Sequence, residues 1–126
     1  MGSRKQAKPV KKPHKIGQRG LQRKADSLFS QLVRSRAGNK CEYCGRTGVL
    51  HCHHGVVHRR YLNTRYVLDN CVCLCVSCHT FLGDFPKINT EFFKKRIGSK
   101  KMEELEIVAR TINGKFDYNI ILEKLK

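Results

Sequence analysis

The sequence predicts an α+β fold in which a small cysteine-rich core of two strands is flanked by helices and preceded by a disordered basic arm. Two C-x-x-C pairs stand 30 residues apart, with short strand-like stretches between them. Apolar residues recur at helical spacing on both sides of this region. The first 24 residues carry nine basic side chains and no acidic one. The length of 126 residues fits one small domain with tails.

Charge and hydropathy divide the chain into a basic arm over 1–24, a core over 25–89 and a helical extension over 90–126. The arm has too few large apolar residues to offset the entropy of ordering it. The net charge of +16 indicates a polyanionic partner. The arm is therefore expected to lie along phosphates through basic residues that include Lys11, Lys12 and Lys15. A solubilising tail and a nuclear-import-like patch are the alternatives.

The elements of the core follow from local patterns. Leu21 begins an apolar stripe that predicts an amphipathic helix over 22–37, which Gly38-Asn39 would terminate. Strand-like stretches follow over 49–54 and 71–74, joined by a long irregular segment. The apolar stripe of the first helix is predicted to pack in the core.

The remaining elements are predicted to be helical. The second strand leads into a helix with Ser77 as a candidate cap and Pro86 as its limit. Three further helices follow in the extension: one capped by Asn89 or Thr90, one preceded by Ser99 and stopped by Asn113-Gly114, and one capped by Asp117.

Four cysteines, Cys41, Cys44, Cys75 and Cys78, form the pattern C-x₂-C-x₃₀-C-x₂-C. Four thiolates at this spacing match a tetrahedral structural zinc site. The total of seven cysteines is odd and no secretory signal is visible, so a metal site fits better than a disulfide framework. The other cysteines are predicted to be small core residues: Cys52, Cys71 and Cys73.

Histidines gather between and after the cysteine pairs. In a strand, His51 and His53 share one face, and His54 points the other way unless the strand ends there. His79 directly follows the last cysteine of the second pair. A second structural metal site and ordinary surface histidines are alternatives to a catalytic role.

The two cysteine pairs combined with His53-His54, Asn70 and His79 resemble an HNH endonuclease of the zinc-bound ββα-metal type, with a treble-clef-like core. The resemblance covers about residues 28–85. It is nearest to small phage-type HNH proteins, in which an Arg-Arg-Tyr stretch follows the first histidine. The same region is also similar to phage recombination nucleases of the NinG type.

The resemblance implies a role for each matching residue. His54 would be the general base that takes a proton from the attacking water. Asn70 would hold the loop between the strands and so orient His54, or else reach the metal. His53 and His79 would bind a catalytic divalent ion, with His53 standing where many HNH proteins carry Asp.

Metal and DNA preferences follow from these residues. Two imidazoles favour Mn²⁺, Ni²⁺, Co²⁺ or Zn²⁺ over Mg²⁺, which prefers oxygen ligands, so broad metal tolerance is expected. Arg59, Arg60 and Arg65 lie between His54 and Asn70 and are expected to grip the DNA backbone beside the cut. Packing of the loop is the alternative role for these arginines.

The resemblance implies a metal-dependent DNA endonuclease that acts in phage packaging, homing or recombination. A non-catalytic zinc module that binds nucleic acid as a scaffold and a structure-specific recombination nuclease are the alternatives. DNA is the expected partner, with a phage terminase or another DNA-processing protein beside it. A monomer would nick and a homodimer would cut both strands.

No apolar run approaches the ~20 residues of a membrane helix, and the expected location is the cytoplasm of a bacterial host.

Overall fold

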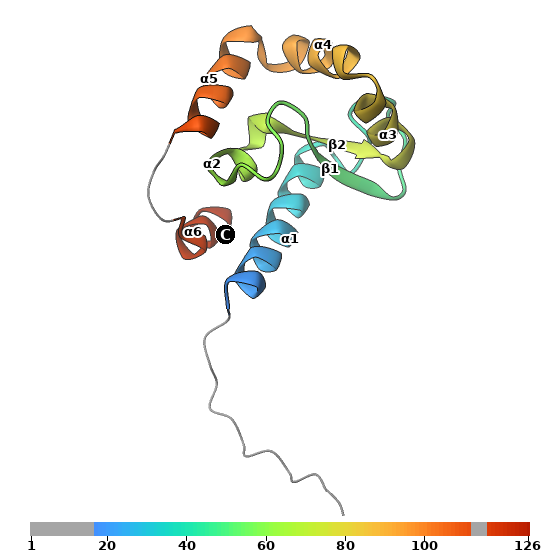
Figure 1. Ribbon diagram of the computed structural model, residues 1–126. Helices are drawn as coiled ribbons and strands as arrows, with labels where there is room; N and C mark the ends of the chain where they lie inside the picture. The colour runs from blue at the N-terminus through green and yellow to red at the C-terminus, as the bar shows by residue number, and fades with distance from the viewer. Residues whose placement is uncertain (1–16, 112–115) are drawn as a thin grey trace, which may run out of the picture.

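The computed structural model describes residues 17–111 and 116–126 (Figure 1). It confirms a mixed α+β fold with one small two-stranded sheet. The elements, in chain order, are α1 (Gln18–Arg36), β1 (Leu50–His54), α2 (Leu62–Arg65), the 3₁₀ turn η1 (Leu68–Asn70), β2 (Cys71–Cys75), α3 (Val76–Asp84), α4 (Pro86–Ile97), α5 (Ser99–Arg110) and α6 (Tyr118–Leu125).

The two strands form the centre of the fold. β1 and β2 pair antiparallel, with Leu50 opposite Cys75 and His54 opposite Cys71. Side chains alternate between the two faces of a strand, so each face meets a different set of helices. Helix α1 packs on one face, and α3 and α4 cover the other. The order β1, β2, α3 is the strand-strand-helix unit that the resemblance implies.

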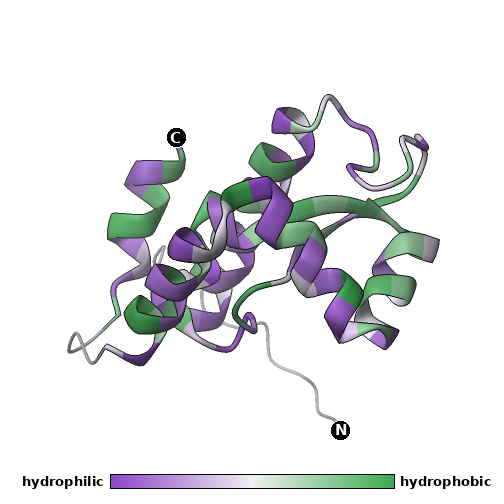
Figure 2. Ribbon diagram, turned by 90° about the horizontal axis from the view of Figure 1, so that it is seen from above, coloured by the Kyte–Doolittle hydropathy of each residue, from purple (hydrophilic) through white to green (hydrophobic). Residues whose placement is uncertain are grey.

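The core has three adjoining parts. On the α1 face, Phe29 and Val33 pack against the buried thiols of Cys71 and Cys73. The other face buries Val72, Leu74, Leu82 and Phe93, and a third cluster joins α1 to α6 through Ala25, Tyr118 and Leu122. Figure 2 shows the matching pattern, in which the helices alternate apolar and polar stretches along their length. The longer helices therefore bury apolar side chains on one side and expose polar ones on the other.

Helix α1 begins earlier than the sequence pattern predicts. Its first residue is Gln18, so residues 18–21, which we expected in the disordered arm and outside the helix, are helical. Leu21 and Ala25 explain the extension, because both contribute to the cluster shared with α6. Residues 1–16, including Lys11, Lys12 and Lys15, lie outside the described part of the chain.

Two predicted helix caps are wrong. Helix α4 begins at Pro86, which fits a first helical position because its missing N–H would have no partner there. Asn89 and Thr90 are therefore interior residues of α4, and the boundary placed between 89 and 90 falls inside this helix. Ser77 lies inside α3, whose N-cap is Cys75.

The other helix ends agree with the pattern where the structure describes them. Asp117 caps α6, its Oδ1 accepting a hydrogen bond from the Asn119 backbone N–H at 2.9 Å. The expected stop at Asn113-Gly114 lies outside the described residues. Among the helices of residues 17–111 and 116–126, none combines the length and apolarity of a membrane-spanning segment.

Candidate metal and catalytic site

The two C-x-x-C pairs converge. One sulfur from each of Cys41, Cys44, Cys75 and Cys78 lies within 4.8 Å of the others, and the Sγ atoms of Cys44 and Cys75 are 3.7 Å apart. Burial would raise the pKa of the Cys41 thiol, but backbone hydrogen bonds from Cys44 and its neighbours lower it to about 6. A thiolate is the form that binds metal. The donor set fits a four-coordinate structural zinc ion.

Local backbone geometry builds the first half of this cluster. Gly45 has φ +82° and its N–H donates to the Cys41 carbonyl, so the chain turns tightly after the second cysteine. The backbone N–H of Cys44 donates to the Cys41 sulfur at 3.5 Å. Glu42, between the two cysteines, ties this turn to β2 by a hydrogen bond between its Oε2 and the Cys73 N–H at 2.8 Å.

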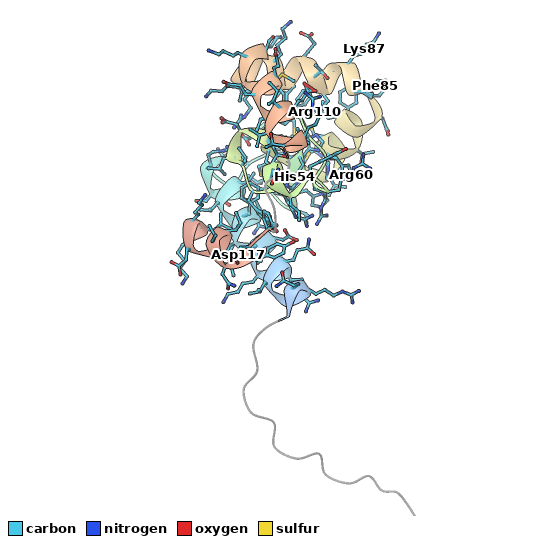
Figure 3. All side chains as sticks on the ribbon, turned by 60° about the vertical axis from the view of Figure 1, so that its left-hand side comes forward. His54, Arg60, Phe85, Lys87, Arg110 and Asp117 are labelled. Carbon is cyan, nitrogen blue, oxygen red and sulfur yellow. The ribbon has the colours of Figure 1, made fainter. Side chains whose placement is uncertain are left out.

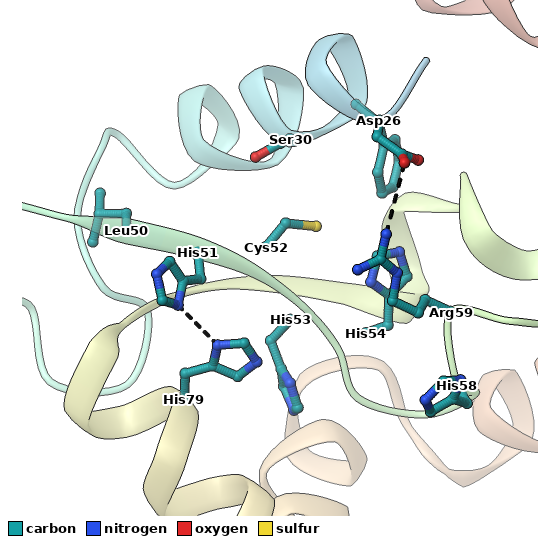
Figure 4. Close-up of a pocket in the computed structure, with 11 residues that line it drawn as sticks. Asp26, Ser30, Leu50, His51, Cys52, His53, His54, His58, Arg59 and His79 are labelled. Carbon is teal, nitrogen blue, oxygen red and sulfur yellow. Dashed lines mark hydrogen bonds and ion pairs between the residues drawn. The ribbon is translucent and has the colours of Figure 1, made fainter. Parts of the chain in front are cut away.

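A cavity of about 520 Å³ lies beside β1 (Figure 4). Residues from both faces of β1 line the cavity, His51 and His53 from one face and Cys52 and His54 from the other. Asp26 and Ser30 of α1 line one side, while His53 and His79 line the other. His54 belongs to the wall as well. The predicted base and the predicted metal ligands therefore line the same cavity.

The surroundings of His54 fix its tautomer. Its Nε2 lies 2.9 Å from the Arg65 carbonyl oxygen, which can only accept, so Nε2 carries the proton and Nδ1 keeps a lone pair. Burial lowers the pKa of His54 to about 4, and the positive charges of Arg65 and Arg59 act in the same direction. The imidazole is therefore neutral at pH 7 and able to accept a proton.

Asn70 holds the loop between the strands. Its side chain is fully buried. The Oδ1 atom accepts from the Val57 N–H at 2.7 Å, while Nδ2 donates to the carbonyls of Val57 and Thr64. The Asn70 carbonyl also accepts from the N–H of Gly55, next to His54. Of the two roles implied for Asn70, the structure favours holding the loop, because its amide is fully engaged there.

His53 is oriented by a residue outside the motif. Asn89 of α4 donates through Nδ2 to the Gly55 carbonyl at 2.8 Å, so its Oδ1 is free to accept. His53 Nε2 lies 2.9 Å from that Oδ1 and must therefore be the donor. Its Nδ1 keeps the lone pair that a metal ligand needs. Burial lowers the pKa of His53, which favours the neutral ring.

His79 stands between two histidines of β1. Its ring centroid lies 5.0 Å from that of His53 and 5.2 Å from that of His51. Burial lowers the pKa of His79, and the nearby His53 and His51 lower it further. Neutral imidazoles on a cavity wall are the donors that divalent transition ions take from proteins. The residues present thus fit a divalent ion on this wall.

The three arginines that were predicted to contact DNA differ in how far they are buried. Arg65 is buried, and its guanidinium binds both carboxylate oxygens of Asp26 at 2.7 and 2.9 Å and the Arg59 carbonyl at 3.1 Å. The alternative role, packing of the loop, is therefore the correct one for Arg65. Arg59 and Arg60 are exposed, and Arg60 lies on the segment after β1 (Figure 3).

The remaining cysteines include a second cluster. Cys52, His54 and Cys71 each offer an atom within 4.8 Å of the other two. Cys71 is fully buried, and burial raises the pKa of its thiol, so the protonated form is favoured. Cys73 is also buried, which agrees with the prediction of small core residues.

The comparisons with known proteins agree with this geometry. A family model described as HNH endonuclease matches residues 41–85. The match spans the cysteine turns, both strands and α3, so this segment is an HNH domain. It covers about a third of the chain and leaves the helices α1, α4, α5 and α6 outside. No curated protein and no solved structure gives a significant match.

Sequence reasoning missed two features of the site. Asn89 was taken as a helix cap, and no local pattern links it to His53, 36 residues away. Asp26 lies on the first helix and had no predicted role, yet it binds Arg65 and contributes to the cavity wall. Both contacts depend on how helices pack around the sheet, which residue spacing along the chain does not encode.

Proposed function

We propose that this chain is a metal-dependent DNA endonuclease that hydrolyses phosphodiester bonds, with His54 as the general base. The observation that carries the proposal is the hydrogen bond from His54 Nε2 to the Arg65 carbonyl. That bond leaves Nδ1 as a proton acceptor, and His54 lines the same cavity as His53 and His79. The HNH domain of residues 41–85 supports a nuclease-type function.

In the proposed reaction, His54 Nδ1 takes a proton from a water molecule. The water oxygen then attacks phosphorus, and the bond from phosphorus to the leaving 3′ oxygen breaks. The Arg65 carbonyl would be well placed to stabilise the imidazolium that forms, because it accepts from Nε2–H throughout. Asn70 keeps the loop that carries this carbonyl in place through its hydrogen bond to Thr64.

His53 and His79 would hold the divalent ion. When bound, such an ion neutralises charge on the phosphate and on the leaving oxygen. Asn89 would keep the Nδ1 atom of His53 available through its hydrogen bond to Nε2. Cys41, Cys44, Cys75 and Cys78 would hold zinc with a structural role, because four protein ligands leave no open position.

The DNA contacts are proposed from charge and exposure. Arg59 and Arg60 follow β1 and are exposed, with Arg59 lining the cavity. Arg59 also lies 3.7 Å from Asp26, an ion pair that a phosphate could replace. The arm residues Lys11, Lys12 and Lys15 would extend the basic surface along the DNA backbone. Such contacts carry affinity without base specificity.

The test is cleavage of supercoiled plasmid by the zinc-loaded chain, with Mg²⁺, Mn²⁺, Ni²⁺, Co²⁺ or Zn²⁺ added. We expect metal-dependent nicked or linear product, reduced about 10²–10⁴-fold in His54→Ala, the usual contribution of a general base. DNA binding by gel shift should be retained. His58→Ala is the matched control, because His58 is an exposed histidine on the same cavity wall.

If the plasmid shifts in the gel but is not cut with any of these ions, the result would contradict the proposed nuclease activity. It would favour a zinc-containing scaffold for nucleoprotein assembly. A preference for branched over linear duplex would favour a recombination nuclease similar to the NinG type. The ratio of nicked to linear product would report whether a monomer or a homodimer acts. A phage origin and a terminase partner remain part of the proposal, as does a place in the host cytoplasm.

A further inference from the structure

His51 is a histidine for which the proposed mechanism has no use. It lies on β1 two residues before His53, on the same face, and it is half-buried. Its Nδ1 atom lies 3.0 Å from the Nδ1 atom of His79 on α3, the contact drawn as a dashed line in Figure 4. The two rings meet at an interplanar angle of 74°.

This contact has the spacing of two ligands on one ion. As a hydrogen bond, it needs a proton on one Nδ1 and a lone pair on the other. With metal–nitrogen bonds of about 2.0–2.1 Å, two nitrogens on one ion lie roughly 2.9–3.4 Å apart for bond angles between octahedral and tetrahedral. The observed separation of 3.0 Å falls in that range, so the two Nδ1 atoms are spaced as two ligands of one cation would be.

Helix α3 supplies few other ligands to this wall. Gly83 stands four residues after His79, one turn along the same helix face, and has no side chain to offer. β1 instead presents two imidazoles on the face toward α3, and His79 contacts both rings. The carboxylate nearest to the cavity, that of Asp26, is on the α1 side and is bound by Arg65.

We propose that His51 is a third ligand of the divalent ion, beside His53 and His79. Ring nitrogens of these three residues do not all lie within 4.8 Å of one another, so the ion is placed at the close pair of His51 and His79, and the His53 ring has to turn toward it. The inference rests on the metal site of the proposed function and deepens it by assigning a ligand and a metal preference. Three nitrogen donors without a carboxylate favour Ni²⁺, Co²⁺ or Zn²⁺ over the oxygen-seeking Mg²⁺.

The experiment measures binding rather than turnover. The zinc-loaded chain is titrated with Ni²⁺ by calorimetry and with Co²⁺ by visible absorption, and zinc content is checked afterwards. His51→Ala should weaken Ni²⁺ binding at least about 10-fold, the lower end of the loss seen even for groups that only support a ligand. The absorption bands of bound Co²⁺ should shift. His58→Ala should bind both ions like the parent chain.

His51→Asn separates ligation from hydrogen bonding. An asparagine can still pair with His79 through its amide, but it lacks the imidazole lone pair. Ni²⁺ affinity in this variant should fall as in His51→Ala. Parental affinity in either variant would overturn the proposal, and so would a loss of affinity in Cys52→Ala alone, because that would place the ion at Cys52, His54 and Cys71.

Plasmid cleavage measured in parallel keeps the two proposals distinct. Loss of cleavage in His54→Ala, together with unchanged Ni²⁺ affinity in the His51 variants, would overturn the third ligand and leave the nuclease standing. Reduced Ni²⁺ affinity in the His51 variants of a chain that never cuts DNA would support the metal site and contradict the nuclease.

Discussion

His54 and His53 are neighbours in sequence but have opposite surroundings. His54 faces α1, where its ring centroid lies 6.1 Å from that of Phe29, and its Nε2 donates to a backbone carbonyl. His53 faces α4, where Asn89 accepts from its Nε2. In both rings the hydrogen bond at Nε2 leaves Nδ1 with the lone pair. One residue step along a strand thus separates the candidate base from a candidate ligand.

The protonation of His54 provides a pH prediction. Its pKa in the folded chain, about 4, lies below the ordinary value of 6.5, chiefly because the ring is buried. Nitrogen-15 NMR of the zinc-loaded chain should therefore show His54 neutral and protonated at Nε2 at pH 6. In the unfolded chain His54 would be mostly protonated at that pH. The free energy of unfolding should therefore decrease as the pH falls from about 6.5 toward 4, because the unfolded chain binds a proton at His54 that the folded chain does not. A His54 ring mostly protonated at pH 6 would contradict the described burial.

Helix α4 packs against the chain at Gly55, the residue that directly follows β1. A Cβ atom added to Gly55 would lie 1.9 Å from a ring carbon of Phe93, which is fully buried. Gly55 also donates its N–H to Asn70 and accepts from Asn89 through its carbonyl. The absence of a side chain here lets α4 reach the end of the strand that carries the histidines.

Gly55→Ala should therefore lower the free energy of unfolding by about 1–3 kcal/mol, the usual cost of overpacking a core. The matched control is Gly83→Ala in α3, where an added Cβ meets nothing within 4 Å. The control should be neutral or stabilising by up to ~1 kcal/mol, because alanine is the better helix former. Urea unfolding of the two variants measures the contrast, and equal stability would contradict the close packing of β1 on α4.

Helix α4 also contributes Asn89, so it should influence metal binding from outside the HNH domain. Asn89→Leu removes the acceptor at His53 Nε2, and we expect Ni²⁺ affinity to fall by about 10–100-fold. The NMR signal of the His53 Nε2–H tautomer should change as well. Thr90→Ala, at the exposed neighbouring position of α4, is the control. Unchanged affinity and tautomer in Asn89→Leu would show that Asn89 serves only to join α4 to the strand.

At the scale of the whole molecule, Glu42 links the cysteine turn to two helices. Its carboxylate lies 2.6 Å from Arg96 of α4 and 3.8 Å from Arg36 of α1. Arg36 in turn donates to the Cys71 carbonyl at 2.6 Å. The cysteine cluster, the sheet and the helices on both faces are therefore parts of one connected structure.

Zinc removal should accordingly unfold more than the cysteine turns. Structural zinc contributes about 10–16 kcal/mol in small domains, comparable with the whole stability of a domain. Cys41→Ser combined with Cys75→Ser should bind no zinc and lose its cooperative thermal transition, followed by circular dichroism. Cys52→Ala should keep one zinc per chain by elemental analysis. A double variant that retained a cooperative transition would contradict the structural role of the cluster.

The features that could be predicted without a structure are those that depend on residues close together along the chain. Two C-x-x-C pairs defined the four-cysteine cluster, alternation placed His51 and His53 on one strand face, and the Asp117 cap began the last helix where expected. In each case, short-range geometry fixes which side chains can share a turn or a face.

The contacts between distant residues of the site follow from the packing of the folded chain and could not be predicted from local patterns. It turned Arg65 inward onto Asp26, placed Asn89 on His53 and brought His51 to His79. These pairs are separated by 28 to 39 residues, and they form because α1, α3 and α4 pack on opposite faces of a two-stranded sheet. Helix packing follows from the burial of whole apolar stripes, so a single polar residue carries no local signal of its partner.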